Sequence, residues 1–485
     1  MEHTTPADHP TVRIVLPLEI VDAIIDELHD DSDSLKHCSL VSRQFVSRSH
    51  KHLFSFIEFV FPNKPMRAHH PAQRMLEIFR NNPGLARNVN HLHLTNYFEG
   101  FWHEHAQEYC RVADEVLPSL FKYLNVLQKF SIDGAWGLTN SRDLTDKRHL
   151  NDISSHLTYA LFQMFRSTDV ADITIENITN FPLGHIASTC PHLKRLSISH
   201  IDSFYPLDDA VIYGTYLTLE DNVHEKLALS TPGRLMTLQI DDRSEHAVET
   251  LYAYTMRPHS HLTLSHVREV TLHGHKLSMR EVAATVITDA ASSLEEFTWD
   301  HNYHVVFADF QYEPINFGKT TRLRILRFAF VHDARFEPVQ LFWVSEVLTA
   351  TRGHNNLEEI ILVLNVDLDD VHDDQWGECA EWAPSFDSLL MSAGFGHLRR
   401  VSFYVDFTEV DHEGPLPMDE YVAINERLEQ RLPRLQEAGL LTVQWIFNEN
   451  SQRSLEFIPH ILVNEREGLD QGKGLLQGVH IPSEF

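Results

Sequence analysis

The stretch Leu193-Lys194-Arg195-Leu196-Ser197-Ile198 carries the pattern that decides the fold of this 485-residue chain. Its last two apolar residues stand two positions apart, as one buried face of a β-strand requires. The same spacing of three apolar residues recurs along the chain. These stretches begin at residues 89, 127, 170, 193, 235, 267, 294, 323, 357 and 398. The recurrence predicts a series of short strands that each bury one face.

Stretches with helical patterning lie between these strands, for example Arg280–Thr288 and Glu337–Thr351. A strand and a helix in repetition are typical of a leucine-rich-repeat solenoid within the α/β class. The spacing is uneven, because starts at 193, 235, 267, 294, 323, 357 and 398 differ by 42, 32, 27, 29, 34 and 41 residues. We interpret the excess over roughly 20–29 residues as long insertions. An α/β layered domain with the same alternation is the competing interpretation.

A different pattern precedes the repeats. Residues Leu16 to Ile20 open a helix, with Pro17 suited to its first turn. A second helix follows the polar break at residues 29–33, and a third begins at Ser42. Three short helices cannot bury all of their apolar side chains alone, so some of this surface should meet a partner or the rest of the chain. The apolar positions include Ile20, Ile24, Ile25, Leu28, Leu35, Cys38, Leu40, Val41, Phe45, Val46 and Leu53.

The wording of residues 16–54, LPLEIVDAIIDELHDDSDSLKHCSLVSRQFVSRSHKHLF, resembles the F-box-like families of fungi. The resemblance implies docking on the Skp-type adaptor of a cullin–RING ubiquitin ligase and presentation of a protein substrate by the C-terminal domain. Many relatives carry Trp where this chain has Phe45, which costs some contact area. The alternative is that the three helices only cap the solenoid. The resemblance places these residues in the docking surface or its supporting core: Leu16, Pro17, Ile20, Ile24, Leu28, Leu35, Val41 and Phe45.

The composition changes define five segments. We expect a disordered tail at 1–11, the F-box-like module at 12–60 and a helical linker at 61–87. The irregular leucine-rich-repeat domain then occupies 88–450, and a second tail follows at 451–485. A helix over Asp419–Leu435 and a strand through Val443, Trp445 and Phe447 would cap the repeat domain.

Charge and cysteine usage narrow the class of partner. The formal charge is 40 − 69 = −29, which disfavours nucleic acid and favours a basic protein partner. The four cysteines lie far apart without CxxC spacing, which indicates a reducing compartment and no structural zinc site. We find neither a secretory signal nor an apolar stretch long enough for a membrane span. The expectation is a soluble protein of the cytoplasm, the nucleus or both.

The later strands offer a candidate substrate surface. Residues that alternate with the buried ones should face away from the helices. In the later repeats these are apolar, aromatic or basic, the types that anchor interfaces. We therefore predict a protein substrate near these residues, unless the C-terminal tail covers them: Arg327, Ile361, Val363 and Tyr404.

Motifs of catalysis and cofactor binding are missing. The pairs His91/His93, His103/His105 and His273/His275 lack a third ligand at a recognisable spacing. We find no phosphate-binding loop, nucleophile elbow or dinucleotide fingerprint. We therefore expect no catalytic residues, cofactor or metal, and a non-enzymatic substrate receptor. The alternatives are an interaction scaffold whose F-box-like module recruits no ligase and, more remotely, a hydrolase on the α/β alternation.

Overall fold

The computed structural model describes residues 17–60, 71–95, 104–134, 155–178, 181, 183–201, 233–241, 244–256, 260–274, 277–301, 315–332, 339–353, 356–367, 382–408, 426 and 428–446. Leu16 and both predicted tails lie outside these residues. The chain has a mixed α/β fold that divides into two compact units. The first unit comprises Met1–His301, Glu313–Leu326 and Ala350–Leu357, and the second Asn302–Tyr312, Arg327–Thr349 and Glu358–Phe485.

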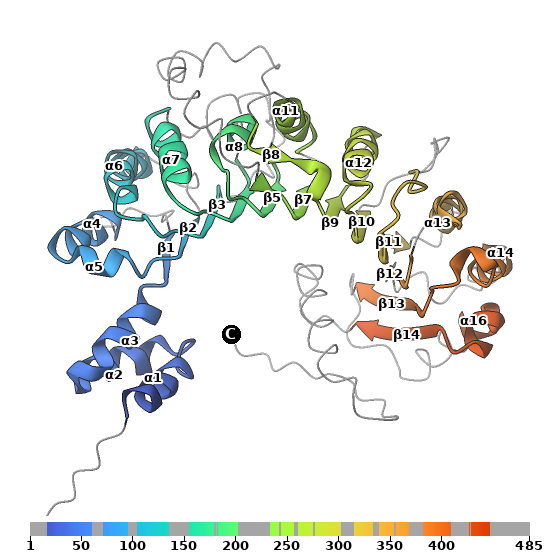
Figure 1. The fold of residues 1–485 in the computed structure, drawn as a ribbon, viewed down its shortest axis with the longest axis horizontal. Coiled ribbons are helices and arrows are strands. Elements are labelled where there is room, and N and C mark those ends of the chain that lie inside the picture. The colour runs from blue at the N-terminus through green and yellow to red at the C-terminus, as the bar shows by residue number, and fades with distance from the viewer. Residues whose placement is uncertain are drawn as a thin grey trace, which may run out of the picture. The chain divides into compact units, whose positions relative to one another are not determined.

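Three helices open the first unit, as predicted: α1 (Leu18–Asp26), α2 (Ser32–Val41) and α3 (Arg43–Leu53) (Figure 1). The Asp31 carboxylate caps α2 by accepting the backbone N–H of Ser34 at 3.0 Å. The Ser42 hydroxyl caps α3 by accepting the N–H of Gln44 at 3.3 Å. Each cap satisfies a backbone donor that the helix itself leaves unpaired.

The strands of the first unit pair in sequence order, β1-β2-β3-β4-β5-β7-β9-β10, and every pair is parallel. Two further short strands, β6 and β8, pair with each other. Parallel neighbours need a crossover connection between them, which the helices provide. The bounds are β1 (Phe56–Val60), β2 (His91–Thr95), β3 (Lys129–Asp133), β4 (Asp172–Glu176), β5 (Arg195–Ser199), β6 (Gly233–Arg234), β7 (Thr237–Asp241), β8 (Leu262–Thr263), β9 (Glu269–His273) and β10 (Glu296–His301).

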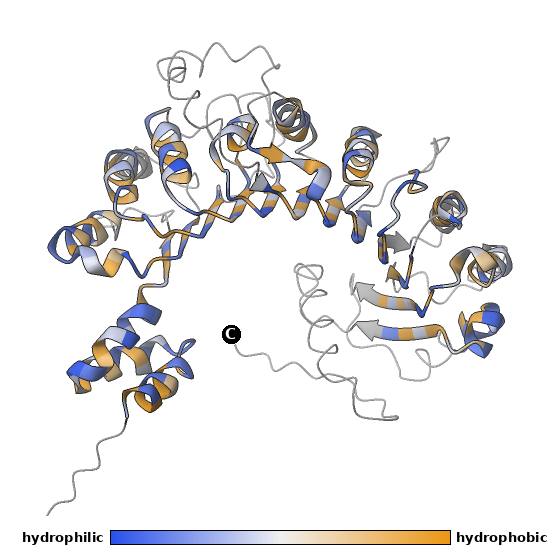
Figure 2. Cartoon of the chain, viewed as in Figure 1, coloured by the Kyte–Doolittle hydropathy of each residue, from blue (hydrophilic) through white to orange (hydrophobic). Residues whose placement is uncertain are grey.

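The helices of this unit that lie between strands pack on one face of the sheet. Figure 1 shows α6, α7, α8, α11 and α12 on the same side of the strands. Along the strands, hydrophobic and hydrophilic residues alternate (Figure 2). The hydrophobic ones meet the helices, and the others form what we call the open face of the sheet. The bounds are α4 (Pro71–Asn81), α5 (Pro83–Ala86), α6 (Glu104–Phe121), α7 (Ser155–Ser167), α8 (Leu183–Thr189), α11 (Glu245–Thr255), the 3₁₀ turn Leu264–His266 and α12 (Leu277–Ala290).

A repeated backbone contact sets the register where the strands begin. The carbonyl of Asn90 accepts the N–H groups of both Gln128 and Lys129, at 2.8 and 2.9 Å. The carbonyl of Gln128 in turn accepts two N–H groups of the next segment. The same double acceptance recurs up to residues 324–325 and again at residues 399–400, so these strands start level with their neighbours. The accepting carbonyls belong to Ser55, Asn90, Gln128, Ala171, Lys194, Met236, Arg268, Glu295 and Glu358.

The predicted strands are confirmed in both units. Each of the ten motif stretches forms a strand or leads directly into one, and every apolar side chain at the three motif positions is buried. The predicted helices at Arg280–Thr288 and Glu337–Thr351 correspond to α12 and α13. Of the predicted helix at Asp419–Leu435, residues 419–425 and 427 lie outside the described part of the chain.

The second unit has the same alternation with a different pattern of burial. Strands β12, β13 and β14 are parallel neighbours. Residues 360–364 of β12 and 401–405 of β13 are all buried, so both faces of these strands are covered. Strand β11 crosses the boundary between the units. The bounds are β11 (Ile325–His332), α13 (Val339–Thr351), β12 (Glu359–Asp367), α14 (Trp382–Leu390), the 3₁₀ turn Ala393–Phe395, β13 (Arg400–Thr408), α16 (Pro433–Glu437) and β14 (Leu441–Ile446).

None of the helices in the described residues is both long enough and apolar enough to cross a bilayer.

Candidate docking surface

The three N-terminal helices have a small core of their own. Val21 and Ile25 of α1 meet Leu35 of α2, and each of these side chains is at most 4% exposed. The partly buried Leu28, Phe45 and Leu53 pack around them. The apolar residues of α1 and the turn after it therefore divide into two sets: Val21, Ile25 and Leu28 belong to the cluster, and Ile20 and Ile24 do not.

A charged contact ties α1 to α3. The guanidinium of Arg48 makes a bidentate ion pair with the Asp26 carboxylate, and His52 Nε2 lies 2.7 Å from Asp26 Oδ1. Hydrogen bonds from Arg48 and then His52 hold the pKa of Asp26 far below its usual value. The contact fixes the roll of α1 about its axis, because Asp26 lies on the flank opposite Ile20 and Ile24.

That orientation leaves large apolar side chains in solvent. Ile20 and Ile24, which share a face of α1 one turn apart, are 49% and 52% exposed. At the end of α2, Leu40 and Val41 are 84% and 75% exposed. With Leu18, these make five of the eleven exposed large apolar side chains in the described residues, on two helices of 9 and 10 residues. Such a concentration is typical of a protein-binding surface.

The apolar residues of the F-box-like motif thus have two distinct roles. Ile20, Ile24 and Val41 are exposed, as is Pro17, whereas Leu28, Leu35 and Phe45 belong to the internal core. Leu16 is outside the described residues. The sequence reasoning omitted Leu18 and Leu40 from the docking residues. Helical spacing could have found Leu40, which lies off the face of α2 that Leu35 buries, but not Leu18, which shares the stripe of Val21 and Ile25 and is exposed at the first turn of α1.

Three of the four residues predicted to form the substrate surface of the later strands are covered, and the surface itself stays a prediction. Ile361, Val363 and Tyr404 are 1%, 0% and 4% exposed, so their side chains are covered like a core. Arg327 is half-buried. The physical reason lies in the sequence of β12 and β13, whose continuous apolar runs suit strands that are buried on both faces.

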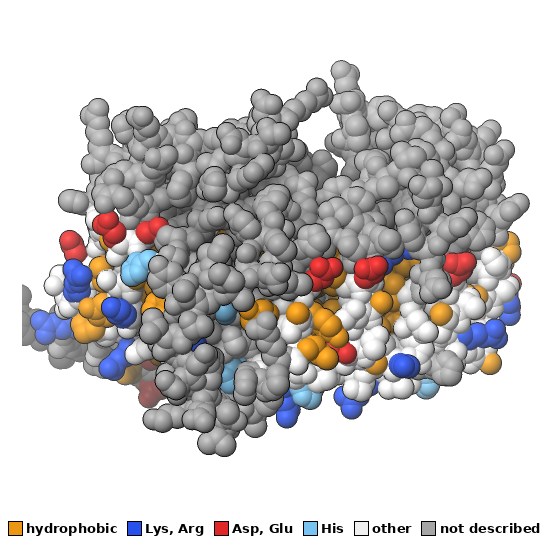
Figure 3. Space-filling view, turned by 90° about the horizontal axis from the view of Figure 1, so that it is seen from above, with side chains coloured by type: hydrophobic (Ala, Val, Ile, Leu, Met, Phe, Trp, Pro, Cys, Tyr) orange, Lys and Arg blue, Asp and Glu red, His pale blue; other side chains and the backbone are white. Residues whose placement is uncertain are grey.

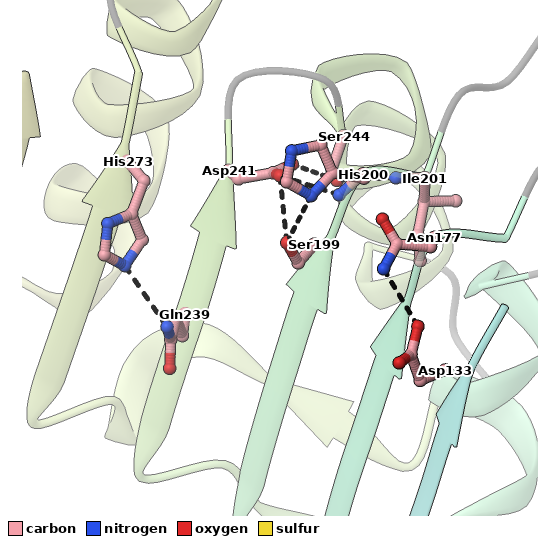
Figure 4. A network of polar contacts seen from close by, with 9 residues as sticks. All are labelled: Asp133, Asn177, Ser199, His200, Ile201, Gln239, Asp241, Ser244 and His273. Carbon is pink, nitrogen blue, oxygen red and sulfur yellow. Dashed lines mark hydrogen bonds and ion pairs between the residues drawn. The ribbon is translucent and has the colours of Figure 1, made fainter. Parts of the chain in front are cut away.

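The carboxyl ends of the middle strands carry a polar network, which Figure 4 shows. The Asp241 carboxylate accepts the N–H of His200 at 2.7 Å, the Ser199 hydroxyl at 3.0 Å and the Ser244 hydroxyl at 2.6 Å. Ser244 also accepts the N–H of Ile201 at 3.0 Å. Burial opposes ionisation of Asp241, but His200 and the hydroxyl of Ser244 outweigh it and keep the pKa of Asp241 below its ordinary value.

Two residues just beyond the strand ends adopt a left-handed backbone. Asn177 has φ 57° and His200 has φ 53°, a conformation that costs energy for residues other than glycine. Hydrogen bonds compensate for it: Asn177 Nδ2 donates to Asp133 Oδ1 at 2.9 Å, and its N–H donates to the Ser199 carbonyl at 2.9 Å. The network therefore holds successive strand ends together.

The network contains Ser, His and Asp without the geometry of a nucleophile. Ser199 Oγ and Asp241 Oδ2 both approach the same ring nitrogen, His200 Nδ1, at 2.8 and 2.9 Å. In a catalytic triad the serine and the carboxylate contact opposite ring nitrogens. His273 pairs with Asp300 at 2.9 Å and with Gln239 at 3.2 Å, again without a nucleophile. A positioning role in the fold accounts for these contacts.

The sequence predicts no metal site at its three His-x-His pairs, and the structure describes only some of these histidines. His91 and His93 lie side by side on β2, with ring centroids 6.3 Å apart. Within the described residues, no group of three His, Cys, Asp or Glu side chains has the geometry to hold a metal ion. His103 and His275 lie outside those residues.

Charged and hydrophobic side chains are mixed elsewhere on the surface. On the face drawn in Figure 3, the hydrophobic side chains of the described residues are interspersed with charged and other polar ones. Exposed apolar residues outside the N-terminal helices include Ile78, Val126, Tyr159 and Met256, each on a different segment. Single exposed residues of this kind are ordinary.

Comparisons with models of known protein families and with curated proteins find no match for this chain.

Proposed function

We propose that this chain is a non-enzymatic substrate receptor of an SCF-type cullin–RING ubiquitin ligase. Its F-box-like helices would dock on a Skp-type adaptor, and the strand–helix repeats would bind a protein substrate. The observation that carries the proposal is the exposure of Ile20 and Ile24 on α1 and of Leu40 and Val41 on α2. Burying one such side chain in an interface contributes about 1.5–3 kcal/mol.

We further propose that the repeats form an irregular leucine-rich-repeat solenoid. Three features of the first unit support this architecture: strands that pair in sequence order, helices on one face, and the carbonyl contact that recurs at each strand start. Repeat units of this kind offer a broad sheet face for recognition.

The test is adaptor binding by the full-length chain carrying Ile20→Asp and Ile24→Asp. Both side chains are exposed, so the chain should fold normally while its affinity for a Skp-type adaptor falls by at least about 100-fold. The matched control is Ile78→Asp on α4, an apolar residue that is also exposed. Calorimetry of purified chain with purified adaptor measures the change.

Two results would count against the proposal. Wild-type chain that fails to bind any Skp-type adaptor removes it, and so does a double variant that binds as tightly as the wild type. Adaptor binding without recruitment of a cullin would instead favour an interaction scaffold that has no ligase.

A further inference from the structure

Strand β1 displays an unusual set of side chains on the open face of the sheet. Phe56 and Val60 are 45% and 49% exposed there, and Glu58 lies between them. Ile57 and Phe59 point to the opposite face and are buried. An aromatic ring and a branched aliphatic side chain thus flank a carboxylate in water.

The neighbouring strand adds two imidazoles to this surface. The register of β1 and β2 places Phe56 opposite His91 and Glu58 opposite His93. The ring centroids of Phe56 and His91 are 4.6 Å apart, and those of Phe56 and His93 are 6.4 Å apart. Burial, aided by the charge of Lys129, lowers the pKa of His91 to about 4, and burial also lowers the pKa of His93. Both rings are therefore uncharged at neutral pH and do not offset the charge of Glu58.

Among the described residues, one oxygen of Glu58 has contacts and the other has none. Thr95 Oγ1 donates to Oε1 at 3.0 Å, and His93 Nδ1 lies 3.6 Å from the same atom. Oε2 has no hydrogen-bond partner among the described residues. With a side chain 41% exposed, Glu58 can accept a further donor from outside the chain.

Across the strands of the first unit, acidic side chains outnumber basic ones on the open face. The register of the first unit aligns the outward side chains of β1 to β10 in three cross-strand rows. Lys129 and Arg195 are the basic residues in these rows, and Lys129 lies 3.9 Å from Asp172. Asp241 and Asp300 are buried and paired with histidines, so six carboxylates against two cations give this face a formal charge of −4 and make it complementary to a basic segment. The six carboxylates are Glu58, Asp133, Asp172, Glu176, Glu269 and Glu296.

We propose that Phe56, Glu58 and Val60 form a docking site for an arginine side chain of a basic segment in a partner protein. The guanidinium would stack on the Phe56 ring and donate to Glu58 Oε2, while its aliphatic stem contacts Val60. Arginine fits better than lysine, because only the planar guanidinium both stacks and donates in a fork. The inference rests on the proposed function, since it names the chemistry of the substrate that the repeat domain would present.

The experiment measures binding of a dye-labelled peptide of alternating glycine and arginine to the full-length chain by fluorescence anisotropy. Comparison peptides replace arginine with lysine or with citrulline, which keeps the shape and loses the charge. We expect the arginine peptide to bind most tightly. Glu58→Gln and Phe56→Leu should each weaken its binding by about five- to tenfold, because they remove the ion pair and the π face separately.

The matched control is Glu269→Gln on β9. Glu269 is an exposed carboxylate of the same face, but it has no aromatic neighbour among the described ring contacts. Glu269→Gln should therefore change the affinity for the arginine peptide by no more than about twofold. Equal losses for Glu58→Gln and Glu269→Gln would reduce the effect to diffuse charge and overturn the site. Unchanged affinity of Phe56→Leu, or equal binding of the citrulline peptide, would overturn it as well.

The same variants separate this site from the proposed function. Glu58→Gln and Phe56→Leu should bind a Skp-type adaptor normally, and the double variant at Ile20 and Ile24 should bind the arginine peptide normally. A chain that binds no adaptor but still requires Glu58 for the peptide would refute the ligase function and keep the arginine site.

Discussion

At the scale of single residues, charge states in the first unit are set by burial and by hydrogen bonds that oppose each other. Asp241 is buried yet stays ionised, because donors from His200 and Ser244 stabilise its charge. His91 has the reverse balance, since its neighbour Lys129 repels a proton that burial already disfavours. Asp241 therefore stabilises the fold in its charged form and His91 in its neutral form.

The pKa of His91 predicts how stability depends on pH. The folded value is about 4 and the ordinary value is 6.5, so the unfolded chain binds the proton more tightly. The stabilising contribution is complete above pH 6.5 and is lost as the pH falls toward 4. At about pH 5 the loss should be about 1 kcal/mol after allowance for solvent exposure. Urea unfolding of wild type and His91→Phe at neutral and acidic pH measures it, and parallel pH profiles would contradict the prediction.

At the scale of elements, the three N-terminal helices are held by one apolar cluster and one charged tie. The cluster of Val21, Ile25 and Leu35 sets which helices pack together, and the tie from Asp26 to Arg48 sets how α1 is rolled. The display of Ile20 and Ile24 depends on that roll.

Asp26→Asn should therefore destabilise the packing of α1 more than is usual for the loss of an exposed ion pair. The amide keeps the shape and loses the ion pair, and we expect the thermal midpoint to fall by a few degrees. Because the folded pKa of Asp26 is depressed, this contribution is present above the ordinary value of 3.8 and disappears in acid below it. Asp33→Asn is the control, since its pair with Lys36 on α2 is largely exposed. Equal effects of the two substitutions would refute the special role of Asp26.

Much of this organisation could be predicted from the sequence, because periodicity reports burial directly. The strand motifs located every described long strand except β1 and β14, and β14 was found from its own alternation. The N-terminal helices followed from helical spacing and capping residues. Hydrophobic spacing and capping residues are local features, so a single chain segment is enough to identify a strand or a helix from them.

The division between core and docking residues could not be predicted in this way. Ile24 and Ile25 are adjacent and chemically identical, yet one is half exposed and the other buried. The difference arises from the roll of α1, which depends on Arg48 more than twenty residues away. The site on β1 was missed for a similar reason, since pairing of Phe56 with His91 is a contact between distant segments.

At the scale of the whole molecule, the two units differ in how their strands are covered. In the first unit, strands such as β2 and β4 alternate between buried and half-buried residues. In the second, consecutive residues of β12 and β13 are buried on both faces. A polar substitution on the face away from the helices should therefore destabilise the second unit strongly and the first unit only slightly.

Val363→Asp on β12 should destabilise the second unit by at least about 3 kcal/mol, because it buries an unpaired charge. Thr174→Asp on β4 occupies the corresponding outward position of a half-covered strand and should change stability by less than about 1 kcal/mol. Thermal unfolding and limited proteolysis of both variants test the contrast. A fully stable Val363→Asp chain would show that this face is open after all.

The aligned register at the starts of neighbouring strands limits where a chain of this kind can gain or lose residues. At most strand starts two amide groups donate to one carbonyl, so a residue added inside such a strand would move every later side chain of that strand to the opposite face. Residues added between the strands disturb nothing of that kind. Successive motifs start 27 residues apart in one case and 42 in another, so the stretches between them are where relatives of this chain can gain or lose residues while the register of the sheet stays the same.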